Sequence, residues 1–184
     1  MGGMRSQLCY ALIAMSLWLK HLHLIQFTSR AKDGAKMLEK IKNDECYTPQ
    51  WVFDAMGIRF DLDVASSNSE MIVVPADRKY TVEDDGLALP WEGRVWMNPP
   101  FSKITPWINK WLEHGNGICL VPLSSNGRWV NQLWESNAHA AYLPANMAFM
   151  TKSGDLIKHR WRCSMWAIGE ENVEALKGIG RTRY

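Results

Sequence analysis

The amino-acid sequence predicts an α/β fold, with a mostly parallel sheet that helices cover on both faces. The chain has 184 residues, which is enough for one sizeable core. Short segments that are apolar, or that alternate apolar with polar residues, take turns along the chain with segments whose apolar residues recur at helical spacing. This alternation favours a parallel sheet, because each connecting helix returns the chain to the same end of the next strand.

The chain divides into two predicted regions. Residues 1–43 combine an apolar N-terminal segment with a basic linker and are expected to lie outside the core, whereas residues 44–184 form the domain. The apolar run at residues 8–19 resembles the core of a signal peptide, but it is short for a membrane span and no clear cleavage site follows it. Three interpretations stay open for it: a signal or anchor, a helix packed on the domain, or a non-native extension.

The first predicted element of the domain is a helix that begins at Thr48-Pro49. Thr48 suits the N-cap, and Pro49 suits the first helical position, where a backbone N–H is not needed. Gly57 ends the helix. The buried face of this helix is expected to carry Trp51, Val52 and Ala55.

Strands and helices then follow in alternation. Residues 58–65 alternate apolar residues with Arg59, Asp61 and Asp63, which predicts a half-buried strand. Residues 71–74 form a short β-branched run that suggests another. Further strands are predicted at residues 94–97, 117–121 and 164–168, and amphipathic helices at residues 103–114 and 127–135.

Charge and cysteine content narrow the function only a little. The net charge is +2, so any basic surface is local, and its best candidates are Lys152, Lys158, His159, Arg160, Arg162, Arg181 and Arg183. The four cysteines are scattered and have no partners at metal-ligand spacing. We therefore expect reduced thiols in a cytoplasmic protein, with no metal site and no disulfide framework.

Two polar clusters follow predicted strands. Asp61 and Asp63, with Ser66, Ser67 and Asn68, come at the end of the first strand, and the tetrapeptide Asn98-Pro99-Pro100-Phe101 follows the strand at residues 94–97. Ligands of parallel sheets bind beyond the carboxyl ends of the strands, so both clusters are candidates for one site.

The tetrapeptide suits the methylation of an exocyclic amine. The nitrogen of an aryl amine is a poor nucleophile because its lone pair is delocalised into the ring. The Asn98 side-chain oxygen and the Pro99 carbonyl can each accept one N–H bond, which aims the lone pair at a methyl donor, and two prolines hold that carbonyl rigid. Phe101 offers a flat face on which an extruded base can stack.

The tetrapeptide resembles the D/N/S-P-P-Y/F signature of amino methyltransferases. Together with Tyr47-Thr48-Pro49-x-Trp51, residues 60–65, Asp84-Asp85-Gly86-Leu87, Trp91 and Trp107, it makes residues 46–168 similar to the phage-type DNA N-6-adenine methyltransferase (Dam) family. The resemblance implies a Rossmann-like fold that uses S-adenosylmethionine to methylate adenine N6 in DNA.

The resemblance also implies where the cofactor binds. The cofactor-binding residues are expected to be Tyr47, Thr48, Pro49, Asp63, Ala65, Asn68 and Asp85. Carboxylates suit the hydroxyl, amine and ammonium donors of this cofactor. The chain departs from the wider superfamily at one place, because Asp63-Val64-Ala65-Ser66-Ser67-Asn68 replaces the usual glycine-rich loop.

DNA is the expected partner, without an obligatory protein partner. Substrate contacts are expected from Ser124, Ser125, Asn126, Lys158 and Arg160, and low sequence specificity is expected because a separate recognition domain needs more chain than remains. Other functions stay open at this point: methylation of cytosine N4, of RNA or of a glutamine amide, all of which present the same NH2 geometry. A catalytically inactive DNA-binding or cofactor-binding module is a further alternative.

Overall fold

The computed structural model describes residues 47–69, 73–124, 127–144, 147–151, 154–158, 162–179 and 181–183. The predicted N-terminal region, residues 1–43, lies outside these ranges. Within them, no helix combines the length and the apolar character that crossing a membrane requires.

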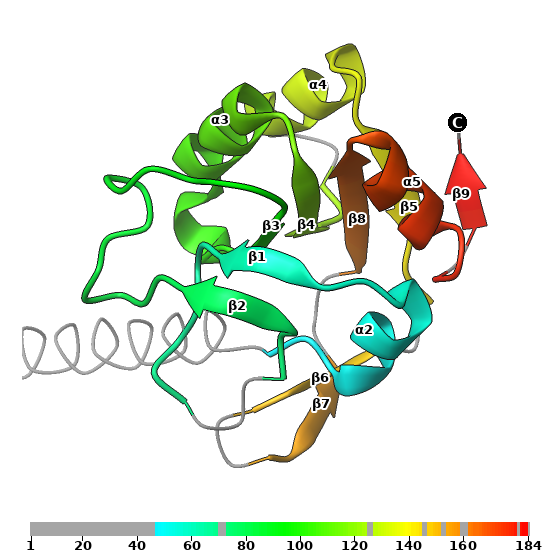
Figure 1. Ribbon diagram of the computed structural model, residues 1–184. Coiled ribbons are helices and arrows are strands. Elements are labelled where there is room, and N and C mark those ends of the chain that lie inside the picture. The colour runs from blue at the N-terminus through cyan, green and yellow to red at the C-terminus, as the bar shows by residue number, and fades with distance from the viewer. Residues whose placement is uncertain are drawn as a thin grey trace, which may run out of the picture. The chain divides into compact units, whose positions relative to one another are not determined.

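The described chain is a mixed α/β fold (Figure 1). Its elements in chain order are α2 (Gln50–Met56), β1 (Phe60–Asp63), β2 (Ala76–Lys79), β3 (Val95–Met97), η1 (Phe101–Lys103), α3 (Ile104–His114), β4 (Gly117–Pro122), α4 (Arg128–Glu135), β5 (His139–Tyr142), β6 (Ala148–Met150), β7 (Leu156–Lys158), β8 (Cys163–Ile168), α5 (Glu170–Leu176) and β9 (Arg181–Arg183).

Seven strands form the main sheet, in the order β2-β1-β3-β4-β8-β5-β9. The first four are parallel to one another. β8 is antiparallel to both of its neighbours, and β9 is antiparallel to β5, so β5 points the same way as the first four strands. Strands β6 and β7 form a separate two-stranded hairpin. The predicted mixed fold with a mostly parallel sheet is confirmed.

Helices cover both faces of the sheet, and two hydrophobic cores result (Figure 1). α2 and α5 pack on one face, and α3 and α4 pack on the other. Side chains along a strand alternate between the two cores, as Ile118 and Leu120 of β4 do with Cys119 and Val121. The sheet is therefore a buried layer, and only its edges and strand ends are open to a ligand.

The order in which strands are added to the sheet reverses at β1. The chain runs from β1 to β2 on one side, then crosses over so that β3 pairs on the other side of β1. In an open α/β sheet, such a switch point leaves a crevice beyond the carboxyl ends of the two strands that flank it. In this sheet that position is beyond β1 and β3, and the two polar clusters identified in the sequence follow these strands.

A bulge in β1 changes which face its residues occupy. The backbone N–H groups of Asp61 and Leu62 both donate to the carbonyl of Arg94, at 2.9 and 3.4 Å. Two consecutive residues facing one partner is the pattern of a β-bulge. Phe60 accordingly packs in the core beneath α2, whereas Leu62 packs in the core beneath α3. Simple alternation placed Asp63 on a solvent face, but the side chain is 3% exposed.

Three local predictions were wrong. Thr48 does not cap α2, since the helix starts at Gln50 after Pro49 and has no side-chain cap. The buried residues of α2 are Val52, Phe53 and Met56 rather than Trp51, Val52 and Ala55. Of the strand suggested at residues 71–74, residues 73 and 74 are not in a strand, and residues 71 and 72 lie outside the described ranges; the strand that follows is β2 at Ala76–Lys79, an edge strand without an apolar pattern.

The other elements lie close to their predicted positions. β3, α3, β4, α4 and β8 begin and end within one residue of the predicted limits, and Gly57 ends α2 with a left-handed backbone. Strands β5, β6, β7 and β9 and helix α5 were not predicted.

Candidate active site

The carboxyl ends of β1 and β3 lie side by side. In the ladder between them, Asp63 is the partner of Trp96. Asn98 follows Trp96 by two residues, so the aspartate and the start of the tetrapeptide stand at the same edge of the sheet.

Asn98 is held by the chain that leads into α2. Its side-chain nitrogen donates to the hydroxyl of Thr48 at 3.5 Å. Thr48 is 4% exposed, and its hydroxyl is turned to Asn98 instead of to the start of α2. This contact ties Asn98 to the chain segment that leads into α2.

The rest of the tetrapeptide is rigid and partly open. Pro99 is buried, Pro100 is exposed, and Phe101 is half-buried. The Pro100 carbonyl accepts the N–H of Lys103, which starts the short helix η1. Phe101 packs against both hydrophobic cores. Its ring therefore sits at the carboxyl edge of the sheet, where a flat ligand can reach the part that is not covered.

Asp63 is a buried carboxyl at the end of β1. Burial raises the pKa of Asp63 from 3.8 to about 7, although the N–H of Ala65, the hydroxyl of Ser66 and the charge of Lys79 each lower it in part. The Ala65 N–H lies 3.3 Å from Asp63 Oδ1. A carboxyl in this state readily accepts hydrogen bonds and favours the approach of a cation, because a nearby positive charge restores its ionised form.

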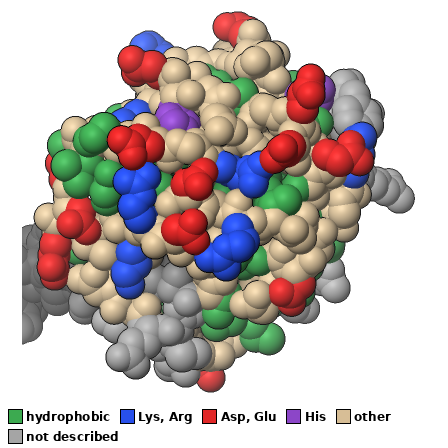
Figure 2. Space-filling view, in the orientation of Figure 1, with side chains coloured by type: hydrophobic (Ala, Val, Ile, Leu, Met, Phe, Trp, Pro, Cys, Tyr) green, Lys and Arg blue, Asp and Glu red, His purple; other side chains and the backbone are tan. Residues whose placement is uncertain are grey.

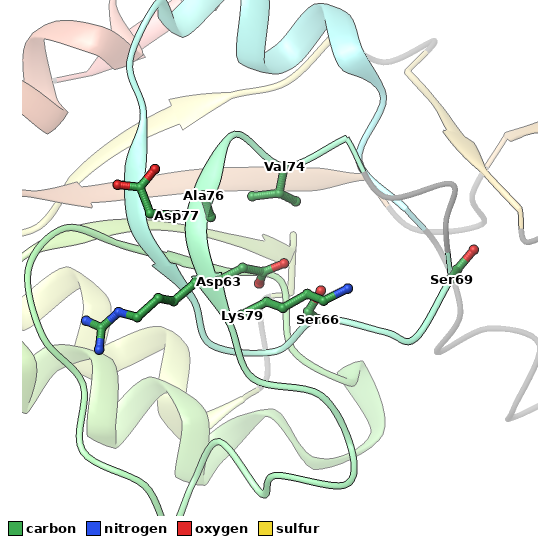
Figure 3. Close-up of a pocket in the computed structure, with 8 residues that line it drawn as sticks. Asp63, Ser66, Ser69, Val74, Ala76, Asp77 and Lys79 are labelled. Atoms are coloured by element: carbon green, nitrogen blue, oxygen red, sulfur yellow. The ribbon is translucent and has the colours of Figure 1, made fainter.

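A pocket of about 350 Å³ opens beside Asp63. Its lining comes from β1, β2 and the loops next to them: Asp63, Ser66, Ser69, Val74, Ala76, Asp77, Arg78 and Lys79. Figure 3 shows Asp63, Ser66 and Lys79 close together, with the Asp77 side chain directed away from them. The pocket thus combines a buried carboxyl, a hydroxyl and an ammonium group.

The loop after β1, residues 64–69, is hydrogen-bonded to two other segments of the chain and is called the β1 loop below. The Ser66 N–H donates to the carbonyl of Tyr80 at 2.8 Å, and the Ser67 hydroxyl donates to the hydroxyl of Tyr47 at 3.0 Å. Tyr47 and Thr48 therefore contact both strand ends, since Tyr47 reaches the β1 loop and Thr48 reaches Asn98. Asn68 is exposed, and its side chain donates to Glu83 at 3.0 Å.

The acidic turn, residues 83–87, packs against the chain just after β1. Asp85 is exposed and has a positive φ of 53°, and its carboxylate accepts the N–H of Leu87. Gly86 is buried so closely that a Cβ atom on it would overlap the carbonyl oxygen of Val64. A glycine is therefore required on the turn, opposite a β1 loop that itself has none.

Lys110 of α3 anchors this turn. Its ammonium donates to the carbonyls of Gly86 and Leu87, at 3.2 and 2.7 Å, and also to that of Leu89. It also lies 5.0 Å from the centre of the Trp91 ring. Burial lowers the pKa of Lys110, while the charges of Asp85 and Glu113 raise it.

Most of the predicted cofactor residues and the tetrapeptide thus meet around two strand ends. Ser124 is half-buried after β4, and its predicted contact with substrate stays a prediction. Ser125, Asn126 and Arg160 lie outside the described residues, as does the side chain of Lys158 in β7.

Sequence reasoning identified Ser67 in the polar cluster after β1 but missed Lys79 and Lys110. Lys79 lies in a strand without an apolar pattern, and Lys110 acts through backbone carbonyls that leave no trace in the sequence. In the described ranges, no group of three or more His, Cys, Asp or Glu side chains is arranged to hold a metal ion.

The comparison with family models matches residues 35–177 to DNA N-6-adenine-methyltransferase (Dam). No curated protein and no solved structure matches the chain. Because the match covers most of the chain, the protein belongs to this family of DNA adenine methyltransferases.

Proposed function

We propose that this member of the Dam family is a Rossmann-like enzyme that transfers a methyl group from S-adenosylmethionine to N6 of adenine in DNA. The observation that carries the proposal is the position of Asn98-Pro99-Pro100-Phe101. The tetrapeptide follows β3 at the switch point of the sheet, and Asn98 is bonded to Thr48, beside the buried Asp63.

The residues around Asp63 fit the cofactor chemically. The molecule has hydroxyl, amine and ammonium donors and carries positive charge, and the buried Asp63 supplies an acceptor that a cation stabilises in its charged form. Hydroxyls of Ser66, Ser67 and Tyr47 stand around the same loop. When bound, S-adenosylmethionine supplies an electrophilic methyl group.

We assign the cofactor to the end of β1, where Tyr47, Thr48 and Pro49 adjoin the β1 loop. Asp63 and Ala65 contribute from the strand end, while Asn68 and Asp85 contribute from the rim. The Lys110 bonds and the tight packing of Gly86 hold the acidic turn in place for this role.

The tetrapeptide handles the amine. The Asn98 side-chain oxygen and the Pro99 carbonyl accept the two N–H bonds of the adenine amino group, which localises its lone pair for attack. The contact with Thr48 supports this role, because it ties Asn98 to the chain segment that leads into α2. Phe101 stacks on the extruded base, and Pro100 keeps the segment from bending.

We propose that sequence specificity is low and that the enzyme acts in the cytoplasm, where DNA and cofactor are available. In the described part of the chain, the only additions to the sheet and its helices are the β6–β7 hairpin and loops. We assign DNA contacts to Ser124, Ser125 and Asn126 after β4 and to Lys158 and Arg160 near the hairpin. Acidic and basic side chains are mixed on the face that Figure 2 shows, so a basic surface is expected elsewhere.

The test is transfer of a tritiated methyl group from S-adenosylmethionine to unmethylated DNA, followed by analysis of the nucleosides. Label in N6-methyladenine, and protection from a restriction enzyme that adenine methylation blocks, are the expected results. Label in N4-methylcytosine, in RNA or in a protein glutamine would show that the protein methylates a different NH2 group. A wild-type protein that transfers no label, or whose activity Asn98→Ala leaves unchanged, would contradict the catalytic proposal.

A further inference from the structure

The β6–β7 hairpin stands at the same edge of the sheet as the tetrapeptide. It interrupts the chain between β5 and β8, after the end of β5 and before the start of β8. β5 points the same way as β1 and β3, and β8 runs opposite to them, with Cys163 at its start paired with Pro122 at the end of β4. The hairpin therefore projects from the carboxyl edge of the parallel strands (Figure 1).

The hairpin is firmly attached to the domain. Phe149 is 2% exposed and, with its cross-strand partner Ile157, packs in the core beneath α2. Met150 exchanges two backbone hydrogen bonds with Tyr47, at 2.8 and 2.9 Å. The turn is closed by bonds between the backbones of Thr151 and Asp155 and of Gly154 and Thr151, each 2.9 Å long.

The other face of the hairpin presents a leucine to solvent. Leu156 is 67% exposed, and its cross-strand partner is Met150. Adjacent residues of a strand point to opposite faces, and Ile157 faces the core, so the Leu156 side chain faces solvent. Leu156 is therefore a large aliphatic side chain that a binding partner can reach.

The sequence on either side of this leucine suits a polyanion. Residues 151–162 contain four Lys or Arg residues and one acidic residue, Asp155. An isolated apolar side chain in a basic segment is typical of proteins that insert a wedge between base pairs and hold the phosphates with cations.

Leu156 lies near the chain segment that contacts the tetrapeptide. Met150 pairs with Tyr47 on one side and with Leu156 on the other. The backbones of Tyr47 and Leu156 are therefore two strand spacings apart, or about 10 Å. Tyr47 precedes Thr48, which bonds to Asn98. A base held at Asn98 therefore leaves its gap in the duplex within reach of the hairpin.

We propose that the enzyme acts on double-stranded DNA and that Leu156, at the end of the β6–β7 hairpin, enters the space vacated by the extruded adenine. This inference rests on the proposed function. Filling the gap restores stacking on both sides and stabilises the extruded state, which otherwise costs the unstacking and unpairing of one base. The residue positions the substrate and takes no part in methyl transfer.

The test compares Leu156→Ser with wild type on three substrates that share the adenine wild type methylates. One is a fully paired duplex, the second lacks the base opposite the target, and the third is the single strand. We expect kcat/KM to fall about tenfold or more on the paired duplex and to stay within about twofold on the other two, where extrusion is easier. A duplex with 2-aminopurine at the target position should show a smaller rise in fluorescence with the variant.

Two further variants make the result specific. Leu156→Phe keeps a large apolar side chain and should retain most of the duplex activity. Val82→Ser removes another aliphatic side chain, which is 84% exposed, and should behave as wild type on all three substrates. Circular dichroism and the thermal midpoint check that each variant is folded.

Different failures point to different errors. If wild type transfers no methyl group to any DNA, the proposed function fails. If wild type is active but Leu156→Ser loses nothing on the paired duplex, or loses equally on all three substrates, only the wedge is refuted. A wild-type enzyme that methylates single strands alone would also refute it.

Discussion

Two neighbouring strands end at the same edge of the sheet, and they end differently. β1 ends in Asp63, a carboxyl that is 3% exposed and whose pKa burial raises to about 7. Asn98 directly follows β3; it is a half-buried amide that cannot change its charge and whose nitrogen lies 3.5 Å from the Thr48 hydroxyl.

The difference matches two demands of the proposed reaction. An amide oxygen and a peptide carbonyl accept N–H bonds at every physiological pH, as a group that orients an amine must do. A buried carboxyl is costly to ionise when nothing positive is near, and it responds strongly when a cation arrives. The end of β3 is thus suited to orienting the adenine amine, and the end of β1 is suited to binding a positively charged ligand.

The largest expected effect is at the β3 end. Asn98→Ala removes an acceptor that acts where the amine becomes a nucleophile, so kcat should fall roughly 10²–10³-fold. The dissociation constant for S-adenosylmethionine should stay within about twofold, because the cofactor is held at the other strand end. Rapid-quench or tritium-transfer kinetics and calorimetric titration measure the two quantities.

Asn98→Asp is the matched control at this position. It keeps an acceptor oxygen in the same place, so it should retain more activity than Asn98→Ala, and that activity should depend on pH because a carboxylate can take up a proton. Equal losses in the two variants would mean that the oxygen is not the group that matters.

The next effect concerns stability at the β1 end. The folded-state pKa of Asp63 is raised above its ordinary 3.8 to about 7, so the folded protein keeps this proton when the unfolded chain releases it. The corresponding stability is present below pH 3.8 and is lost as the pH rises to about 7. Asp63→Asn abolishes this loss and should be more stable than wild type at pH 8, by roughly 2–4 kcal/mol.

Urea unfolding of both proteins between pH 4 and pH 8 gives the comparison, and the difference should shrink toward zero at the acid end. Asp77→Asn is the control, because Asp77 lines the same pocket but is exposed and paired with Arg59. The same Asp63→Asn variant should bind S-adenosylmethionine about tenfold more weakly while kcat changes little. A constant stability difference at all pH values would show that the carboxyl is ionised throughout.

A third prediction separates the packing of the β1 end from its charge. Gly86→Ala places a Cβ atom against the Val64 carbonyl, so the acidic turn must shift away from the β1 loop. We expect the unfolding free energy to fall by about 1–3 kcal/mol and cofactor affinity to fall with it. Methyl transfer at saturating cofactor should change least.

Gly115→Ala is the matched control for this change. Gly115 has a left-handed φ of 73° but nothing within 4 Å of a Cβ atom, so its substitution tests backbone strain alone. It should lower stability by about 1 kcal/mol and leave cofactor affinity unchanged. Equal effects of the two substitutions on cofactor affinity would mean that the acidic turn does not take part in binding the cofactor.

The same comparison shows what the sequence could and could not predict. Asn98 was predictable, because two prolines end its strand and the tetrapeptide carries the chemistry in four adjacent residues. The face that Asp63 occupies was not, since it depends on the bulge at Asp61 and Leu62, where two N–H groups share one carbonyl. A one-residue shift in a strand moves every later side chain to the other face.

Other misses have related physical causes. β2 is an exposed edge strand, and its residues, Ala76–Lys79, carry no apolar alternation. Thr48 has the residue type of a helix cap, but its hydroxyl bonds to a side chain 50 residues away. The hairpin that exposes Leu156 depends on pairing with Tyr47, far back in the sequence. Each feature depends on long-range contacts that local patterns do not contain.

The smallest expected effect lies where the two strand ends are joined. Tyr47→Phe removes the hydroxyl that accepts the Ser67 bond and leaves the backbone pairing with Met150 intact. Loss of one part-buried hydrogen bond lowers stability by about 0.5–1.5 kcal/mol. Because the bond steadies the β1 loop and not Asn98, the loss should appear as a few-fold weaker cofactor binding with kcat unchanged. Ser67→Ala removes the same bond and also the acceptor of the Ser69 N–H, which lies 3.1 Å away, so the double variant should be no worse than Ser67→Ala alone. Additive losses in cofactor affinity would mean that Tyr47 and Ser67 act on the cofactor separately, and the two strand ends would then be less closely coupled than their geometry indicates.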